Sequence, residues 1–208
     1  MDGAELGAQL ERIAHEVRSC ERCGLHATRT HAVPGAGSAG AEILFIGEGP
    51  GFHEDQQGLP FVGRSGEYLS YLLNLIHLRR EDVFITNIIK CRAPNNRDPL
   101  PHEIEACRPY FDRQLSLIDP LVVATLGRFS MRLFFPGASI SRIHGQARID
   151  GGRAYLPLYH PAAALRNPNL RHDMEADIAQ LRTLRDEMRQ RRAAGEIAAP
   201  KHEQKTLF

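Results

Sequence analysis

Four short apolar runs, separated by longer amphipathic stretches, constrain the fold of this chain most strongly. The runs cover residues 43–46, 83–88, 121–126 and 154–159. Strands of a parallel sheet read as near-continuous apolar runs because helices cover both faces of the sheet. The alternation therefore predicts an α/β fold, a three-layer α/β/α sandwich with a central four-stranded, mainly parallel sheet.

Three helices are predicted around this sheet. Leucines and tyrosines recur at helical spacing over residues 65–77, and residues 172–192 form a charged amphipathic stretch. Another helix is expected from Pro101 to Ile118, with Pro109 kinking or shortening it. The 208 residues suffice for one domain, which we expect over residues 1–192, followed by a flexible tail over 193–208.

Composition narrows the class of protein. No apolar run is long enough to cross a membrane and no secretory start is present, so we expect a cytoplasmic protein. A net charge of +1 argues against a uniformly basic protein, yet it leaves room for a local basic groove. Six arginines fall in or near the loops described below, and ordinary surface arginines are the alternative reading: Arg64, Arg92, Arg97, Arg142, Arg148 and Arg166.

The chain holds four cysteines in two separated pairs, Cys20 with Cys23 and Cys91 with Cys107. Two residues between the first pair bring both sulfurs to one side of the backbone, so the pair can chelate one metal centre. Zinc and iron–sulfur clusters both accept four thiolates, but the wide spacing of the second pair favours a bulky cluster. Buried free cysteines or a disulfide are the alternatives, and stable disulfides are rare in the cytosol.

In an open parallel sheet, ligands bind beyond the carboxyl ends of the strands, so the loops after the strands are the places to search. After the first strand, three glycines in residues 47–51 allow a close backbone approach to a ligand, and Glu48 and Glu54 add carboxylates. The terminal Gly-Lys-Ser of a phosphate-binding loop is absent, which disfavours a nucleotide triphosphatase.

Three further side chains stand out in these loops. Phe61 lies among turn residues, Asn87 ends the second strand, and His160 follows the last strand. An amide offers both a donor and an acceptor, which suits reading the edge of a base, and a histidine suits proton transfer or electrophilic help. Each also has an ordinary structural reading, as a core ring, a turn residue and a loop histidine respectively.

Taken together, these motifs resemble the family 4 uracil-DNA glycosylases, the iron–sulfur members of the uracil-DNA glycosylase superfamily. The resemblance covers roughly residues 10–185 and rests on several independent segments in the same order. They are Cys20-x2-Cys23, residues 47–51, Glu54-Asp55, residues 60–64, Thr86-Asn87, residues 90–92, Cys107, His160-Pro161 and Leu165-Arg166.

The resemblance implies an enzyme that flips uracil out of DNA and hydrolyses its bond to deoxyribose, leaving an abasic site in an uncut strand. Phe61 would stack on the base, Asn87 would bind its N3 and O4 edge, and backbone amides near Gly49 would complete the contacts. His160 would bind uracil O2 and stabilise the departing anion. Glu48, with Glu54 as a second carboxylate, would orient or activate water.

The resemblance also implies a cofactor and a DNA-facing surface. Cys20, Cys23, Cys91 and Cys107 would hold a 4Fe-4S cluster, for which we favour a structural role. Arg64, Arg142, His144 and Arg166 would face DNA, with the arginines meeting phosphates. A related group attaches uracil-DNA covalently through a histidine after the second strand, but residues 91–98 contain none. Turnover is therefore expected.

The last five residues, Gln204 to Phe208, resemble the short peptides that bind bacterial sliding clamps, and a chance apolar end is the alternative. Nothing in the sequence requires more than a monomer. Two rival functions use the same cysteines: an iron–sulfur electron carrier or redox sensor, and a metal-stabilised DNA-binding module without catalysis. Both leave Phe61, Asn87 and His160 without a task.

Overall fold

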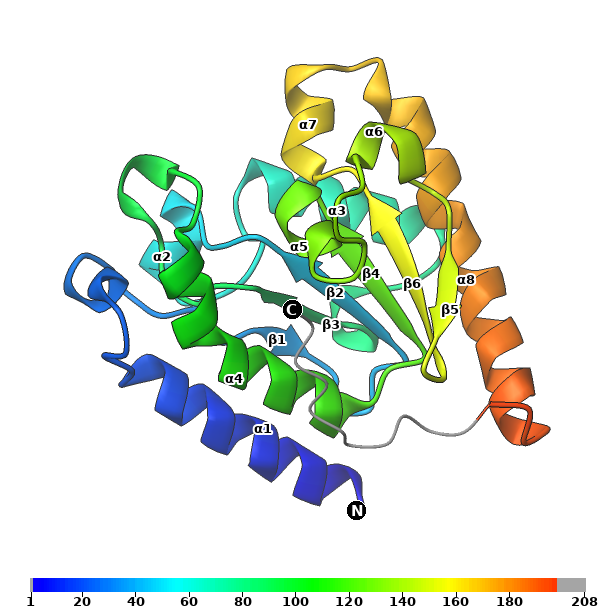
Figure 1. Ribbon diagram of the computed structural model, residues 1–208, viewed down its shortest axis with the longest axis horizontal. Helices are drawn as coiled ribbons and strands as arrows, with labels where there is room; N and C mark the ends of the chain where they lie inside the picture. The colour runs from blue at the N-terminus through cyan, green and yellow to red at the C-terminus, as the bar shows by residue number, and fades with distance from the viewer. Residues whose placement is uncertain (1, 198–208) are drawn as a thin grey trace.

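The structure is a computed structural model that describes residues 2–197, and a six-stranded sheet forms its middle layer (Figure 1). In sheet order the strands are β1-β3-β2-β4-β6-β5. Their bounds are β1 Ala36–Gly37, β2 Ile43–Gly47, β3 Phe84–Asn87, β4 Val122–Leu126, β5 Arg148–Asp150 and β6 Arg153–Leu158. The inner four, β3, β2, β4 and β6, are parallel, while β1 and β5 pair antiparallel at the edges.

The four apolar runs are confirmed as the four parallel strands, but the expected strand count was too low. The two additional strands give little apolar signal. β1 has only two residues, and all three residues of β5 are exposed. They extend the sheet through backbone hydrogen bonds, which the pattern of apolar side chains does not report.

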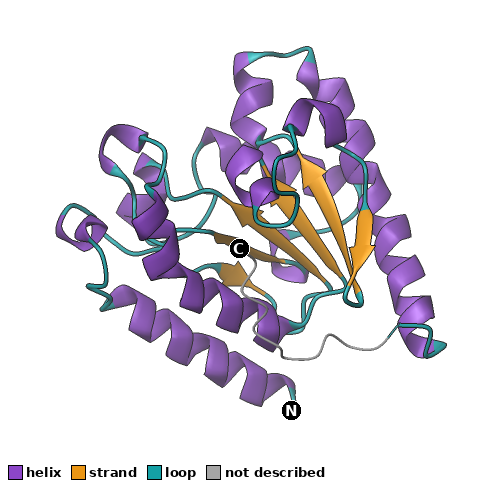
Figure 2. Cartoon of the chain, viewed as in Figure 1, coloured by secondary structure: helices purple, strands orange, loops and turns teal. Residues whose placement is uncertain are grey.

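Helices cover both faces of the sheet, as Figure 2 shows. Their bounds are α1 Gly3–Arg18, α2 Phe52–Gln57, α3 Arg64–Leu75, α4 Pro101–Ile118, α5 Arg128–Arg132, α6 Ile140–Ile143, α7 Pro161–Arg166 and α8 Leu170–Ala193. Strand side chains alternate between two cores: Phe45 packs toward α3 and α8, whereas Leu44 and Ile46 pack toward α1 and α4. The three-layer sandwich is thereby confirmed.

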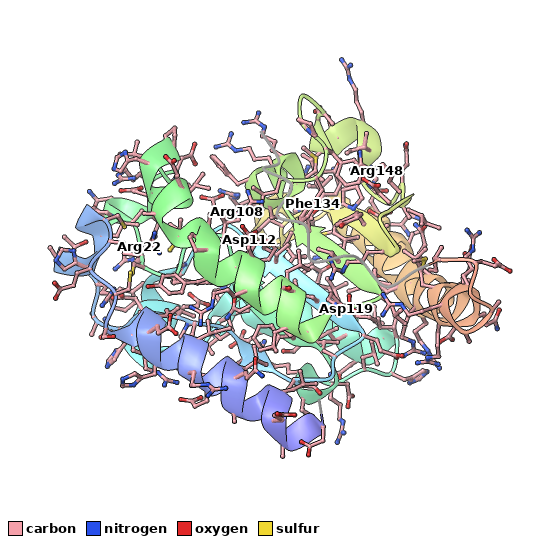
Figure 3. The ribbon with its side chains drawn as sticks, turned by 60° about the horizontal axis from the view of Figure 1, so that its bottom comes forward. Arg22, Arg108, Asp112, Asp119, Phe134 and Arg148 are labelled. Carbon is pink, nitrogen blue, oxygen red and sulfur yellow. The ribbon has the colours of Figure 1, made fainter. Side chains whose placement is uncertain are left out.

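Helices α1 and α4 lie side by side on one face of the sheet (Figure 3). An ion pair between Arg113 of α4 and Glu16 of α1 joins them. The first turn of α4 begins with Pro101, and Glu103 accepts a hydrogen bond from the Leu100 amide. Helix α4 has the predicted bounds, Pro101 to Ile118, so of the two effects expected of Pro109 the shortening does not occur.

Helix α8 ends at Ala193, close to the expected start of the tail. The predicted clamp-binding peptide, residues 204–208, lies outside the described residues. Within residues 2–197, no helix is both long and apolar enough to span a membrane. Because β2, β3, β4 and β6 run parallel, their carboxyl ends meet at one edge of the sheet, where the predicted site residues follow the strands.

Candidate functional site

Four predicted residues lie at or near the edge formed by the carboxyl ends of the strands, and we call them together the strand-end site: Glu48, Phe61, Asn87 and His160. Glu48 follows β2, and Asn87 is the last residue of β3. His160 follows β6 as the N-cap of α7, and Phe61 lies in the segment between α2 and α3. The rings of Phe61 and His160 are 5.7 Å apart between centroids.

Gly47, the last residue of β2, lets two of these side chains converge. A Cβ atom there would lie 2.4 Å from Asn87 Oδ1 and 2.8 Å from Cζ of the Phe61 ring. Both separations are shorter than van der Waals contact, so no residue with a side chain fits without displacing them. The missing side chain of Gly47 is therefore what brings Asn87 and Phe61 to one point.

Asn87 is fully buried, yet its carboxamide oxygen has no hydrogen-bond partner among the described residues. A buried polar atom without a partner costs about 1–3 kcal/mol, so native structures rarely leave one without a reason. Backbone groups on either side of Asn87 are paired normally, since Ile88 N donates to Gly47 O at 3.0 Å. The open acceptor marks a place for a donor on a bound ligand.

The backbone of Phe61 is held in a left-handed conformation, with φ of 53°. That conformation is uncommon for a residue with a side chain and requires support from its surroundings. Arg80 supplies part of it, because its guanidinium donates to the Phe61 carbonyl at 2.9 Å and to the Pro60 carbonyl at 2.6 Å. A side chain at Gly66 would collide with the same Phe61 carbonyl, only 1.7 Å from its Cβ.

Glu54 supplies the remaining support for this segment. Its carboxylate accepts hydrogen bonds from the amides of Gly51 at 3.1 Å, Val62 at 2.9 Å and Gly63 at 3.0 Å. Both carboxylate oxygens are thus occupied by backbone donors. The geometry favours Glu54 as an anchor of the Phe61 segment over a group that activates water.

Glu48 is in a different situation, since no hydrogen bond to its carboxylate is found among the described residues. Burial raises its pKa, the nearby Asp98 raises it further, and Arg128 opposes the shift. Arg128 is itself paired with Asp98 at 2.6 Å. A partly buried carboxylate with a raised pKa and free oxygens has the properties of a general base.

The hydrogen bonds of His160 define which ring nitrogen carries the proton. The amide of Ala162 donates to Nδ1 at 3.1 Å, so Nδ1 is an acceptor. Burial lowers the pKa of His160 to about 4, with Arg166 adding to the shift, so the ring is neutral near pH 7. A neutral ring that accepts at Nδ1 carries its proton on Nε2, which leaves an N–H donor for a ligand.

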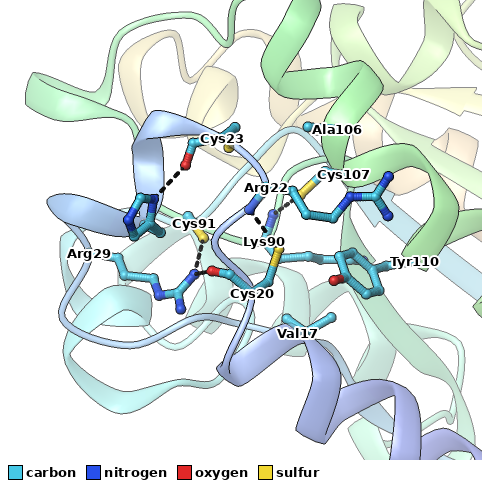
Figure 4. A pocket seen from close by; sticks show the side chains of 11 residues that line it. Val17, Cys20, Arg22, Cys23, Arg29, Lys90, Cys91, Ala106, Cys107 and Tyr110 are labelled. Carbon is cyan, nitrogen blue, oxygen red and sulfur yellow. Dashed lines mark hydrogen bonds between the residues drawn. The ribbon is translucent and has the colours of Figure 1, made fainter.

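All four cysteines line a single cavity between the start of the chain, the segment after β3 and helix α4 (Figure 4). Cys91 follows β3 and Cys107 is on α4, as predicted, whereas Cys20 and Cys23 follow α1, a helix that was not predicted. Arg29 donates to Cys91 Sγ at 3.1 Å, and the Lys90 amide donates to Cys107 Sγ at 3.3 Å.

The donor set fits an iron–sulfur cluster. All four cysteines are free thiols, and N–H groups of Arg22, Arg29 and Lys90 already point at three of the sulfurs. Burial raises the pKa of Cys107 to about 11, so its thiolate needs a positive partner such as bound iron. In residues 2–197, no three His, Cys, Asp or Glu side chains are arranged to hold one metal ion, so the fit rests on the shared cavity and its donors.

The predicted DNA-facing residues divide into two groups. Arg64, Arg142 and Arg166 are exposed, and their guanidinium groups have no partner within residues 2–197. His144 is partly buried instead, hydrogen-bonded to Asp177 at 2.7 Å and packed against the Tyr159 ring at 4.5 Å between centroids. Three other arginines of the expected groove make internal contacts: Arg92 with Asn96, Arg97 with Glu103 and Arg148 with the Phe134 carbonyl.

Sequence reasoning missed several supporting residues. Lys90 is 1% exposed, and burial lowers its pKa to about 7. A lysine inside the apolar run after β3 was an available signal, because lysine is almost never buried without a partner. Arg80 and Gln114 carried no comparable signal, since their contacts arise only when distant segments fold together.

Comparisons with known proteins agree with this geometry. Residues 34–182 match the family model described as the uracil DNA glycosylase superfamily. A type-4 uracil-DNA glycosylase of Saccharolobus solfataricus is 48% identical over 83% of this chain and 85% of its own length. Those of Sulfurisphaera tokodaii and Archaeoglobus fulgidus are each 46% identical, covering 84% and 83% of this chain and 84% and 91% of their own lengths.

Proposed function

The chain belongs to the uracil-DNA glycosylase superfamily, and from that premise we propose that the strand-end site removes uracil from DNA. The activity is that of a DNA repair glycosylase, which hydrolyses the bond between uracil and deoxyribose and leaves an abasic site. The two rival functions, an electron carrier and a non-catalytic DNA-binding module, gain no support from the comparisons.

Recognition of uracil is proposed for Asn87 and Phe61. The unpaired Oδ1 of Asn87 would accept from uracil N3–H, while the amide nitrogen would donate to O4. Cytosine presents an acceptor at N3 and donors at N4, so it would leave both groups of Asn87 unpaired. The ring of Phe61 would stack on the flipped base and recover part of the unstacking cost. Gly49, beside Ile89, would offer its backbone at the same edge.

Bond cleavage places negative charge on uracil and positive charge on the sugar. The neutral His160 ring would donate a hydrogen bond from Nε2–H to uracil O2. This hydrogen bond would stabilise the departing uracil anion. Glu48 would orient or activate the attacking water and favour the cationic sugar. Glu54 is proposed to contribute indirectly, by holding the segment that carries Phe61.

We propose that Cys20, Cys23, Cys91 and Cys107 hold a 4Fe-4S cluster. Such a cluster would pin the segment after α1 to the segment that follows Asn87. Arg64, Arg142 and Arg166 are proposed to meet DNA phosphates. Clamp binding through residues 204–208, a monomeric state and turnover without covalent attachment stay predictions from the sequence.

The observation that carries the proposal is the convergence of an open Asn87 acceptor, an aromatic ring and a neutral histidine donor at one strand edge. The test is incubation with an end-labelled oligonucleotide containing one uracil, followed by alkali, which breaks the strand at abasic sites. A cytosine-containing strand is the matched control. Cleavage of the uracil strand alone is expected, and Asn87→Asp should begin to admit cytosine. An intact uracil strand after alkali contradicts the proposal.

A further inference from the structure

Lys90 is a buried amine that the proposed chemistry leaves unused. It is 1% exposed, and its Nζ donates to Thr86 Oγ1 at 2.6 Å, the Asn87 carbonyl at 2.8 Å and Gln114 Oε1 at 2.8 Å. An ammonium has three protons, so these three acceptors satisfy it completely. These acceptors are a hydroxyl, a backbone carbonyl and a carboxamide oxygen, so the amine is held by hydrogen bonds to neutral groups.

The acceptors of Lys90 form a closed network. Gln114 donates to the Pro34 carbonyl at 2.7 Å, and Thr86 donates to the same carbonyl at 3.1 Å. Lys90 itself accepts from the Val33 amide at 2.7 Å through its own carbonyl. A buried network with all its hydrogen bonds made is rigid, because moving any member would leave the others without partners in a low-dielectric interior.

One member of this network is the residue that we propose reads uracil. The carboxamide oxygen of Asn87 has no partner, so its direction depends on how the Asn87 backbone is fixed. Lys90 Nζ holds the Asn87 carbonyl, while the Lys90 amide donates to Cys107 Sγ at 3.3 Å. A single residue therefore touches the cysteine cavity with its backbone and the base-reading residue with its side chain.

On the basis of the proposed function, we propose that Lys90 is a positioning residue for uracil recognition. It fixes the backbone of Asn87 through its side chain and links Asn87 to the cysteine cavity through its own amide. Lys90 touches neither substrate nor cofactor in this assignment. It acts through Asn87 alone, so its contribution should vanish when the Asn87 side chain is absent.

The test is a double-mutant cycle with Lys90→Met, which keeps the length of the side chain but removes its donors. Single-turnover excision of uracil should slow about ten- to a hundredfold in Lys90→Met, because three buried acceptors lose their donor. In an Asn87→Ala background, the same change should slow excision by less than about twofold. A full additive loss in that background would overturn the proposal, since a general structural role predicts additivity.

Arg29→Met is the matched control on the cysteine side. Arg29 donates to Cys91 Sγ and to the Cys20 carbonyl but makes no contact with Asn87. Lys90→Met should retain most of its bound iron, measured by iron content and visible absorption, whereas Arg29→Met should lose iron. If Lys90→Met loses iron as Arg29→Met does, its effect belongs to the cavity and the positioning role is refuted.

If Lys90→Met does not fold, Thr86→Val carries the test, because it removes one acceptor of the ammonium and keeps the shape. Its loss should be smaller but again absent in the Asn87→Ala background; additivity there overturns the inference. Wild-type activity separates the two hypotheses. An inactive wild type refutes the proposed function, whereas an active wild type with an additive cycle refutes only the role of Lys90.

Discussion

The two sides of the strand-end site draw their support from different distances along the chain. On one side, the Asn87 carbonyl accepts from Lys90 Nζ, and Lys90 is tied to Gln114 and Cys107 on α4, with Gln114 donating to the Pro34 carbonyl. On the other, the Phe61 segment is held by two charged side chains, with Glu54 on its amides and Arg80 on its carbonyls.

This difference separates local from long-range support. The groups that hold Phe61 all lie within residues 51–80, whereas those that hold Asn87 include residues before β1 and on α4. Only the Asn87 side shares atoms with the cysteine cavity. Damage to that cavity should therefore reach the base-reading amide and spare the stacking ring, although the two side chains meet at Gly47.

Gly47→Ala should have the largest effect, because its new Cβ would displace both sides together. Asn87 Oδ1 and the Phe61 ring would each have to move by more than half an ångström to reach ordinary contact. We expect kcat/KM for uracil excision to fall about a thousandfold. Gly40→Ala is the control, since nothing lies within 4 Å of its Cβ, and it should change kcat/KM less than about twofold. Near-normal activity in Gly47→Ala would show that the convergence is dispensable.

Cys107→Ser should disturb the Asn87 side of the site and leave the Phe61 side unchanged. Replacing the Cys107 sulfur by a hydroxyl on a shorter bond lengthens the contact to the Lys90 amide and removes one of the four proposed iron ligands. We expect loss of iron and roughly a hundredfold lower kcat/KM. Hydrogen exchange followed by mass spectrometry should show faster exchange in residues 84–90. Equal loss of protection in residues 60–66 would mean that the two sides are not independently held.

Glu54→Gln should weaken the support of the segment that carries Phe61. A carboxamide keeps one oxygen acceptor but loses the charge that binds three amides, so the Phe61 segment should be held less firmly. We expect about a tenfold fall in kcat/KM with full retention of iron and faster exchange confined to residues 60–66. A hundredfold fall with unchanged exchange would instead assign Glu54 to the chemistry.

A change of pH should have the smallest effect on kcat/KM, and this effect should arise from Glu48 rather than from the supports of Asn87 or Phe61. In the proposed mechanism Glu48 acts as a carboxylate, so its raised pKa means that kcat/KM should fall as pH drops through that raised value. His160 has a pKa of about 4, so it stays mainly neutral between pH 5 and pH 7 and should add no second step to the pH profile there. The profile should therefore show one descending limb on the acid side. Glu48→Gln should lower the rate and remove the slope; a slope that survives would point to another group.

The parallel sheet was predictable because each inner strand is apolar on both faces, and the site residues were predictable because they follow those strands. The edge strands β1 and β5 were not, since their pairing uses backbone atoms alone. Sequence spacing also left the roles of Glu48 and Glu54 open. Glu54 is engaged by the amides of Val62 and Gly63, eight and nine residues away, and only the folded loop brings them to its carboxylate.

The continuous course of α4 through Pro109 has a consequence for which changes in chain length this fold accepts. Cys107 faces the cysteine cavity and Gln114 faces Lys90, and they are seven residues apart, which is close to two full turns. Inserting or deleting one residue between them would rotate one relative to the other by about 100°. The number of residues between Cys107 and Gln114 is therefore fixed by the helical repeat, whereas the residue types on the outer face of the helix can vary.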